Sequence, residues 1–240
     1  MAAHGDGCRR ARPHRNLSLA MVLTDLAYQG PKRGADRAVL LAHGAGADMN
    51  AATLTTVADA LADAKVPSLR FNFPYRAAGR RAPDRAAVLE AAVREAMREL
   101  AGRTKLPPER LVLGGRSMGG RVCSMVAADA DAAGEARVLG LVLLGYPLHP
   151  PGRATQLRVE HFARLQMPAL FVSGTRDAFG TPAELQRETK KLKGSVSFHW
   201  VETGDHGFKP LKSSGLTVDA VLADVAGAVV DFVTGSSNSR

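Results

Sequence analysis

Cysteine and aromatic residues are scarce in this sequence of 240 residues, which has two cysteines, one tryptophan and 5% aromatic residues. Cys8 lies in a polar N-terminal segment and Cys123 lies beyond a glycine-rich turn, so the pair predicts neither a disulfide framework nor a zinc site. Clusters of His, Cys and carboxylates with metal-ligand spacing are also missing, and we expect no metal and no cofactor. The low cysteine content favours a reducing compartment, so we expect a cytoplasmic protein.

Long apolar runs are missing as well. The most hydrophobic stretches, such as Val138–Leu144, end after the length of a strand, which argues against a membrane-spanning helix. The basic segment 1–16 lacks the continuous apolar core of a secretory signal, so we interpret it as a disordered tail, with a transit peptide as the alternative. We therefore expect a soluble protein with no membrane partner.

Acidic residues are in the minority, since 23 Asp and Glu stand against 32 Lys and Arg and give a formal charge of +9. An excess of positive charge is compatible with nucleic-acid binding. Arg76, Arg80, Arg81 and Arg85 form a local cluster. The low aromatic content and the lack of a nucleic-acid-binding motif nevertheless favour a solvated basic surface over a nucleic-acid partner.

Short runs rich in Val and Leu alternate with longer segments of helical periodicity between Ala38 and Val201. This alternation predicts an α/β fold with a mostly parallel central sheet flanked by helices on both faces, in a single domain over residues 17–235. Residues 236–240 are expected to form a second disordered tail. Strands are expected at 38–42, 68–71, 111–114, 138–144, 169–173 and 197–201, an antiparallel edge strand at 17–25, and helices at 50–64, 84–101, 118–130, 182–192 and 218–233.

Several residues at the predicted helix ends have the chemistry of caps. Asp84 and Thr181-Pro182 precede apolar repeats and are expected to begin two helices, and Asp48 or Asn50 is expected to cap an earlier one. Gly102 is expected to end the helix predicted at 84–101. The segment 146–167, between two predicted strands, has only about twenty residues, so we expect at most one short helix at 157–165 and little or no lid domain.

The strongest chemical motif is Gly115-Arg-Ser-Met-Gly119, which follows a predicted strand and precedes a predicted helix. This is the G-x-S-x-G pattern of a nucleophile elbow, in which small flanking residues permit a sharp, strained turn that exposes the serine hydroxyl. Ser117 would then lie at a helix N-terminus, where free N–H groups stabilise developing negative charge. An ordinary glycine-rich turn is the alternative, and the residues that follow favour the elbow of an α/β-hydrolase.

An acid and a base occur after later predicted strands, in the order that a Ser-Asp-His triad on this fold requires. Asp177 follows the strand at 169–173, and His206 follows the strand at 197–201 in a glycine-flanked loop. A carboxylate at Asp177 can orient His206 and stabilise the imidazolium formed when Ser117 loses its proton. A surface-turn aspartate and an ordinary loop histidine are the alternatives. Asp205 is expected to be a turn residue.

An oxyanion hole requires two N–H donors directed at one point. Met118, directly after the nucleophile, is expected to provide one, and Ala45 in the glycine-containing segment after the strand at 38–42 the other, unless that segment is only a structural turn. His43 is expected to brace this loop. His149 is expected either to line the substrate entrance or to lie in a turn, and Cys123 to pack beneath the elbow.

Four motifs together resemble the KANL3/Tex30-like branch of α/β-hydrolases, including its bacterial dienelactone-hydrolase-like members: His43-Gly-Ala-Gly-Ala-Asp-Met49, Gly115-Arg-Ser-Met-Gly119, Tyr146-Pro-Leu-His149 and Leu170-Phe-Val-Ser-Gly174. The resemblance covers nearly the whole chain after Leu17. It implies the α/β-hydrolase fold and hydrolase activity. Dienelactone hydrolases proper have a cysteine nucleophile where this sequence has Ser117, so the resemblance does not extend to dienelactone as the substrate.

The sequence therefore predicts a serine hydrolase that acts on a small-molecule acyl substrate through an acyl-enzyme intermediate. A carboxylic ester is favoured, although amides, thioesters and lactones share the same tetrahedral chemistry. The alternative is a non-catalytic scaffold with the same fold that binds a protein partner, because a fold does not guarantee an activity.

Overall fold

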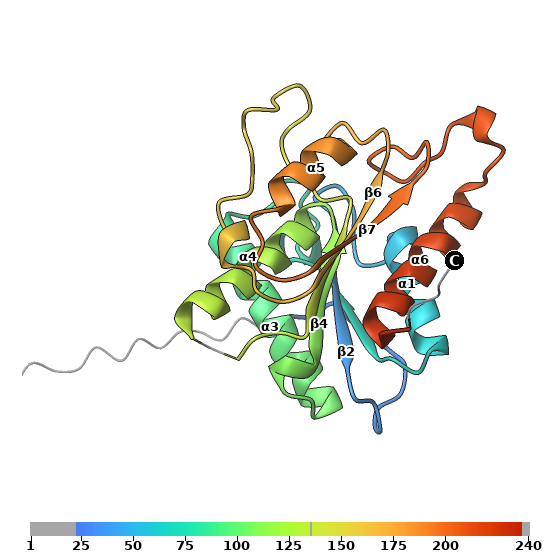
Figure 1. Ribbon diagram of the computed structural model, residues 1–240. Helices are drawn as coiled ribbons and strands as arrows, with labels where there is room; N and C mark the ends of the chain where they lie inside the picture. Colours follow the sequence, from blue (N-terminus) through green and yellow to red (C-terminus); the bar gives the residue numbers. More distant parts are fainter. Residues whose placement is uncertain (1–22, 135, 237–240) are drawn as a thin grey trace, which may run out of the picture.

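The computed structural model describes residues 23–134 and 136–236 (Figure 1). Its strands form one sheet with the order β1-β3-β2-β4-β5-β6-β7. Every neighbouring pair is parallel except β1 and β3, which are antiparallel. The strands are β1 (Leu26–Gln29), β2 (Ala38–Ala42), β3 (Ser68–Phe71), β4 (Leu111–Arg116), β5 (Gly140–Leu144), β6 (Ala169–Gly174) and β7 (Val196–Val201).

Helices cover both faces of this sheet, as the sequence predicts. In Figure 1, α1 and α6 lie on one side of the strands and α3 and α4 on the other. Among the described residues, no helix combines the length and the apolarity needed to cross a bilayer. The α-helices are α1 (Ala52–Asp63), α2 (Pro74–Ala77), α3 (Ala86–Thr104), α4 (Met118–Ala133), α5 (Pro182–Thr189) and α6 (Val218–Thr234).

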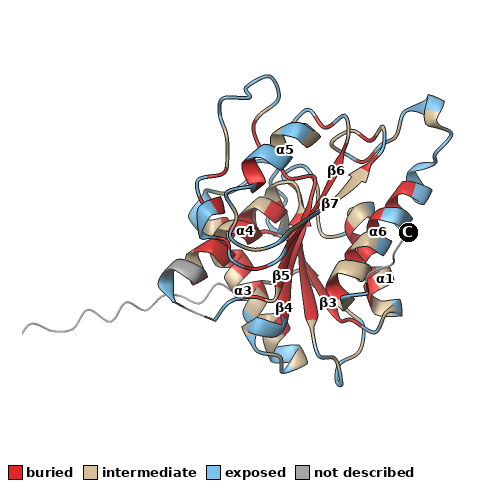
Figure 2. Ribbon diagram, viewed as in Figure 1, coloured by how far each residue is buried: buried red, intermediate tan, exposed pale blue. Residues whose placement is uncertain are grey.

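The alternation of side chains along the central strands divides the core into two layers. Leu40 and Leu113 pack with residues of α3 and α4, whereas their neighbours Val39 and Val112 pack with residues of α1 and α6. Because both faces are covered, the strands β2 and β5 are buried along their whole length (Figure 2). This explains why the sequence of each of these strands is a continuous apolar run and not an alternation of apolar and polar residues.

The N-terminal edge strand lies later than predicted. Part of the predicted segment 17–25 falls outside the described residues, and residues 23–25 are not in a strand. Strand β1 begins at Leu26 and pairs with β3 in antiparallel register, so the prediction of an antiparallel edge is confirmed but its bounds were wrong. The two predicted tails lie outside the described residues, apart from Ser236.

Two predicted helix N-caps, at α3 and α1, are absent. Arg85 is the N-cap of α3 and makes no side-chain cap bond, and Asp84 instead pairs with Arg80. Helix α1 begins after Ala51 without a side-chain cap, because the carboxylate of Asp48 accepts a hydrogen bond from the N–H of Asn50 within the preceding turn. Local hydrogen bonds of this kind compete with capping.

The end of α3 also differs from the prediction. The helix continues through Gly102 to Thr104, and Lys105 ends it in the left-handed conformation with φ of 60°. Glycine is tolerated near a helix terminus at a modest entropic cost, so its presence alone does not end a helix. By contrast, the predicted cap of α5 is confirmed, since Thr181 and Glu184 form a capping box and Pro182 occupies the first turn.

The segment between β5 and β6 contains no lid domain. Its only helical turn in the described chain is a 3-10 turn at Phe162–Arg164, shorter than the helix predicted at 157–165. Tyr146 and Phe162 are fully buried and their rings lie 5.3 Å apart, which anchors the segment to the core. This segment therefore places no lid domain over the carboxyl ends of the central strands.

Candidate active site

Ser117 lies on the sharp turn between β4 and α4. Its φ is +49°, a conformation that side chains other than glycine adopt only under constraint. Its N–H donates to the carbonyl oxygen of Leu144 at 2.8 Å, which ties the turn to the end of β5. A Cβ atom at Gly115 or Gly119 would lie 2.1 or 2.4 Å from the carbonyl oxygen of Ala42, so both positions require glycine. The backbone of β2 therefore packs directly against the turn.

The structure brings the three predicted triad side chains into one hydrogen-bonded series. Nε2 of His206 lies 2.9 Å from Oγ of Ser117, and Nδ1 of His206 lies 2.8 Å from Oδ2 of Asp177. Asp177 follows β6 and His206 follows β7, so all three side chains come from the carboxyl ends of parallel strands. The geometry allows His206 to accept a proton from Ser117 while Asp177 holds the opposite ring nitrogen.

The carboxylate of Asp177 is almost fully buried, with 1% of the residue exposed. The N–H of Phe179 donates to its Oδ1 at 2.8 Å, so the carboxylate is held from a second side. The ring of Phe179 stacks on His206 with the centroids 4.0 Å apart. Sequence reasoning missed Phe179, because its stacking partner His206 lies far along the chain.

Arg116, inside the elbow motif, is a second residue that sequence reasoning missed. Its guanidinium donates to the carbonyl oxygen of His206 and, at 3.3 Å, to that of Leu144. It also lies 4.9 Å from the ring centre of Phe208. Burial lowers the pKa of Arg116 to about 10, against the opposing effect of Asp177 and Asp205. The guanidinium stays charged at neutral pH and joins the serine turn to the histidine loop.

The loop after β2 is held by the side chain of Tyr75, which reaches it from α2, and by that of His43, which lies within the loop. The hydroxyl of Tyr75 donates to the carbonyl oxygen of Ala45 at 2.8 Å. The buried His43 accepts the N–H of Phe73 on Nε2 at 3.0 Å, and its Nδ1 lies 2.8 Å from the carbonyl oxygen of Gly44. Burial lowers the pKa of His43, which favours the neutral ring that this pattern requires. His43 thus braces the loop, as predicted.

A cavity of about 650 Å³ opens in front of Ser117 and His206. Met118 and Ala45 both line it. Within the part of the chain that the structure describes, neither of their backbone N–H groups has a hydrogen-bond acceptor. The residues lining the cavity are Gly44, Ala45, Gly46, Ala47, Ala51, Thr53, Arg116, Ser117, Met118, Arg121, Pro147, Arg158, Phe179, His206 and Gly207.

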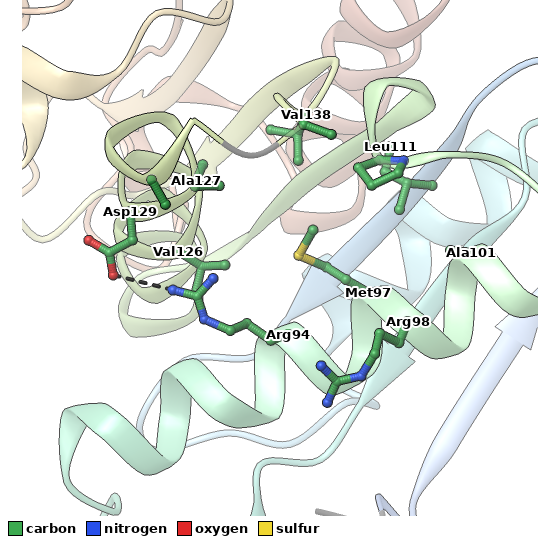
Figure 3. Close-up of a pocket in the computed structure, with 13 residues that line it drawn as sticks. Arg94, Met97, Arg98, Ala101, Leu111, Val126, Ala127, Asp129 and Val138 are labelled. Atoms are coloured by element: carbon green, nitrogen blue, oxygen red, sulfur yellow. Dashed lines mark hydrogen bonds and ion pairs between the residues drawn. The ribbon is translucent and has the colours of Figure 1, made fainter. Parts of the chain in front are cut away.

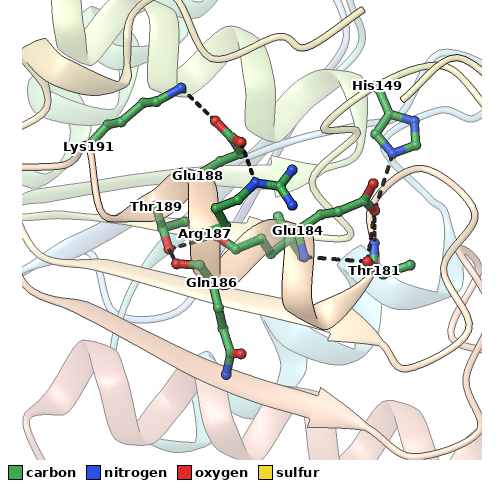
Figure 4. A network of polar contacts seen from close by, with 9 residues as sticks. His149, Thr181, Glu184, Gln186, Arg187, Glu188, Thr189 and Lys191 are labelled. Atoms are coloured by element: carbon green, nitrogen blue, oxygen red, sulfur yellow. Dashed lines mark hydrogen bonds and ion pairs between the residues drawn. The ribbon is translucent and has the colours of Figure 1, made fainter. Parts of the chain in front are cut away.

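His149 does not reach this cavity. The side chain turns away toward Glu184 near the start of α5, with Nε2 3.4 Å from the carboxylate (Figure 4). The same carboxylate accepts the N–H of Thr181 at 2.9 Å, as part of the capping box. His149 therefore belongs to the network that holds α5, and of the two predicted roles the structure favours the turn.

Two further predictions about polar residues are confirmed. Cys123 is fully buried beneath the elbow, and its Sγ lies 3.3 Å from the carbonyl oxygen of Gly114. Burial raises the pKa of the Cys123 thiol to about 12, so it carries no thiolate at neutral pH. Asp205 is a turn residue whose Oδ1 accepts the N–H groups of Gly207 and Lys209.

A second cavity of about 580 Å³ lies between α3 and α4, at the opposite end of the sheet. It is lined by Leu111, where β4 begins, and by apolar residues of both helices, while Arg94 pairs with Asp129 at 3.3 Å beside it (Figure 3). None of its lining residues belongs to the Ser117 series. No group of described residues could hold a metal ion either.

The parallel sheet, the strand-turn-helix at Ser117 and the order of the strand ends define an α/β hydrolase. The chain belongs to the alpha/beta hydrolase domain family, whose model matches residues 35–234. The family match does not distinguish branches of the family, so the assignment to the KANL3/Tex30-like branch rests on the motif resemblance alone.

Solved structures with the same fold come from several organisms. An α/β serine hydrolase homologue from Coxiella burnetii shares 19% identity, with a TM-score of 0.66, over 86% of this chain and 90% of that one. Est1E from Butyrivibrio proteoclasticus, solved with ferulic acid bound, shares 14% identity, with a TM-score of 0.67, over 88% and 94%. A dienelactone hydrolase from Anabaena variabilis shares 19% identity, with a TM-score of 0.63, over 88% and 91%.

Proposed function

We propose that this protein is a serine hydrolase that cleaves a carboxylic ester or a related acyl bond. The observation that carries the proposal is the double contact of His206, which lies 2.9 Å from Oγ of Ser117 and 2.8 Å from the carboxylate of Asp177. A nucleophile, a base and an orienting acid within hydrogen-bond distance are the arrangement that activates a serine. The family and the esterase and hydrolase neighbours support the same reaction class.

In the first half of the proposed reaction, Oγ of Ser117 attacks the acyl carbon and its proton passes to Nε2 of His206. The imidazolium that forms is stabilised by the buried carboxylate of Asp177. The substrate oxygen becomes negatively charged, and the free N–H groups of Met118 and Ala45 are the donors that would stabilise it. The alcohol leaves with the proton from His206, and an acyl group remains on Ser117.

In the second half, His206 accepts a proton from water, which attacks the acyl carbon and releases the acid. Ser117 regains its proton and the cycle closes. The loops that cover the strand ends leave the cavity open to small substrates, so no interfacial flap has to move before a substrate binds. The KANL3/Tex30-like motifs support a place in that branch, and the serine nucleophile separates this chain from dienelactone hydrolases proper.

The proposal is tested by hydrolysis of short-chain p-nitrophenyl esters. Asp177→Asn is expected to lower kcat by about 10⁴, because the carboxylate no longer fixes the tautomer of His206. Ser117→Ala is expected to lower kcat by about 10⁶. His199→Gln is the matched control, because His199 lies in β7 and pairs with Asp224 on the surface. Equal rates in the wild type and Ser117→Ala would overturn the proposal.

A further inference from the structure

The cavity at Ser117 is lined by three arginines and by no carboxylate among the described residues. Arg116 already has hydrogen-bond partners, since its guanidinium donates to two backbone carbonyl oxygens. Arg121 and Arg158 remain. Both are half-buried, and both border the space in front of the nucleophile.

Arg121 has no partner for its guanidinium within the described chain. Its side chain makes no hydrogen bond there, and its Nε is buried without an acceptor. An unpaired charged donor that is buried has a cost in free energy. We therefore expect the Nε of Arg121 to have its acceptor in a bound ligand, because no protein group in the described chain accepts from it. Arg121 lies in the first turn of α4, four residues after Ser117, and its backbone N–H donates to the carbonyl oxygen of Ser117 at 3.1 Å.

Arg158 comes to the same cavity from the segment between β5 and β6. Its only side-chain hydrogen bond in the described chain is a long one, 3.5 Å, to the carbonyl oxygen of Pro147. No described carboxylate lies within ion-pair distance of Arg158 or Arg121, although Glu160 and Glu90 act on them through longer-range charge.

The two guanidinium groups also act on each other. Burial lowers the pKa of Arg158, and the positive charge of Arg121 lowers it further. Two like charges at one cavity repel, and a bound anion would remove this repulsion while accepting hydrogen bonds from both. A carboxylate suits two guanidinium groups, because each presents paired N–H donors that match carboxylate oxygens.

We propose that Arg121 and Arg158 bind a carboxylate carried by the substrate itself, so that the substrates are monoesters of short dicarboxylic acids. This inference rests on the proposed function. Ser117 attacks the ester carbonyl, the alcohol leaves with a proton from His206, and water then releases the dicarboxylic acid. The chain between the two acyl carbons is short because Arg121 is only about one helical turn from Ser117.

The test compares three ethyl esters that differ in the charge at the far end of the acyl chain. Monoethyl glutarate carries a carboxylate, ethyl pentanoate is neutral, and ethyl 4-(trimethylammonio)butanoate carries a positive charge. Hydrolysis is followed by proton release at constant pH. For the wild type, we expect kcat/KM for monoethyl glutarate to be at least about tenfold above that for ethyl pentanoate, because one charge-assisted hydrogen bond contributes about this factor. The cationic ester is expected to have the lowest kcat/KM of the three.

Arg121→Gln and Arg158→Gln are each expected to lower, by about tenfold, the ratio of kcat/KM for the anionic ester to kcat/KM for the neutral ester. Arg121→Lys is expected to retain part of this ratio. Arg153→Gln is the matched control. It removes one charge from the same segment as Arg158, but Arg153 is exposed and does not line the cavity. An unchanged ratio in Arg121→Gln, or an equal fall in Arg153→Gln, would overturn the proposal, because the preference would then reflect the overall charge.

A second measurement does not depend on turnover of the chosen esters. Glutarate is expected to slow the labelling of Ser117 by a fluorophosphonate in the wild type and to protect much less in Arg121→Gln. Protection by inorganic phosphate but not by glutarate would overturn the choice of a carboxylate. Labelling without protection by either anion would overturn the inference and leave the proposed function standing, whereas a folded protein that is never labelled would remove the proposed function itself.

Discussion

Arg116 and His206 are joined by a hydrogen bond from the guanidinium to the backbone carbonyl oxygen of the histidine. The bond links the residue directly before Ser117 to the loop that carries the base, so the relative position of the two reacting side chains depends on it. Arg116 is expected to act as a positioning residue, because it reaches the chemistry only through His206.

Replacement of Arg116 should therefore change kcat more than KM. Arg116→Met leaves the carbonyl oxygens of His206 and Leu144 without this donor, and a displacement of the base by about 1 Å can cost about a hundredfold in rate. Arg116→Lys, which keeps one cationic donor, is expected to recover part of the loss. Steady-state kinetics with a p-nitrophenyl ester, together with the thermal unfolding temperature, separate this role from general loss of structure.

Because the backbone of β2 packs directly against the elbow, we expect a side chain at Gly119 to lower the free energy of unfolding and one at Gly102 not to lower it. Gly119→Ala places a Cβ atom 2.4 Å from the carbonyl oxygen of Ala42, which is expected to cost about 3 kcal/mol in the free energy of unfolding. Gly102→Ala, in the last turns of α3, has open space around its Cβ and is expected to stabilise by about 0.5–1 kcal/mol. Urea unfolding measures both. A stable Gly119→Ala variant would contradict the close approach.

The buried His161 should make stability depend on pH below neutrality. Burial, with the charges of Arg121 and Arg164, lowers its pKa from 6.5 to about 4, and its Nε2 lies 2.7 Å from Oγ of Ser124. The unfolded chain therefore binds a proton at a higher pH than the folded chain does. The stabilisation is present above pH 6.5 and is lost as the pH falls toward 4, with a total of up to about 3 kcal/mol.

His161→Gln keeps a hydrogen-bonding group near Ser124 but does not titrate. Its free energy of unfolding is expected to fall less steeply than that of the wild type between pH 6.5 and 4. Denaturant unfolding at several pH values checks this difference. Identical pH profiles for the two proteins would show that His161 is protonated equally in the folded and unfolded states.

Because α5 has a side-chain N-cap and α1 has none, we expect substitutions at the starts of these two helices to differ in their effect on stability. Thr181→Ala removes the side-chain oxygen that accepts the N–H of Glu184, and is expected to cost about 1 kcal/mol in stability. Asn50→Ala lies before α1, whose start has no side-chain cap, and is expected to change stability by less than about 0.5 kcal/mol. Equal losses in the two variants would contradict the assignment of Thr181 as the cap.

The parts of the fold that depend on burial could be predicted from the sequence. Strands such as Ala38–Ala42 are apolar because both faces of the sheet are covered, and this pattern persists along the chain. The caps at Asp84 and Asp48 could not be predicted reliably, because a short polar side chain also finds partners in turns and ion pairs. Which partner it takes depends on the positions of neighbouring residues, which local patterns do not contain.

The same distinction applies to the candidate site. The elbow glycines and the chain order of Ser117, Asp177 and His206 were visible in the sequence, because a tight turn and a series of strand ends leave local signals. The contacts of Arg116, Phe179 and Tyr75 depend on residues far along the chain that meet only in the fold. Sequence spacing alone gave no reason to pair them.

Labelling of the purified protein with a fluorophosphonate, read by intact mass, is the decisive measurement of whether Ser117 is an activated nucleophile. We expect one label per chain, no label in Ser117→Ala, slow labelling in His206→Gln, and normal labelling in the control His199→Gln. A folded wild type that stays unlabelled, or a label that persists in Ser117→Ala, would contradict this expectation. The first of these results would favour a non-catalytic scaffold with the same fold.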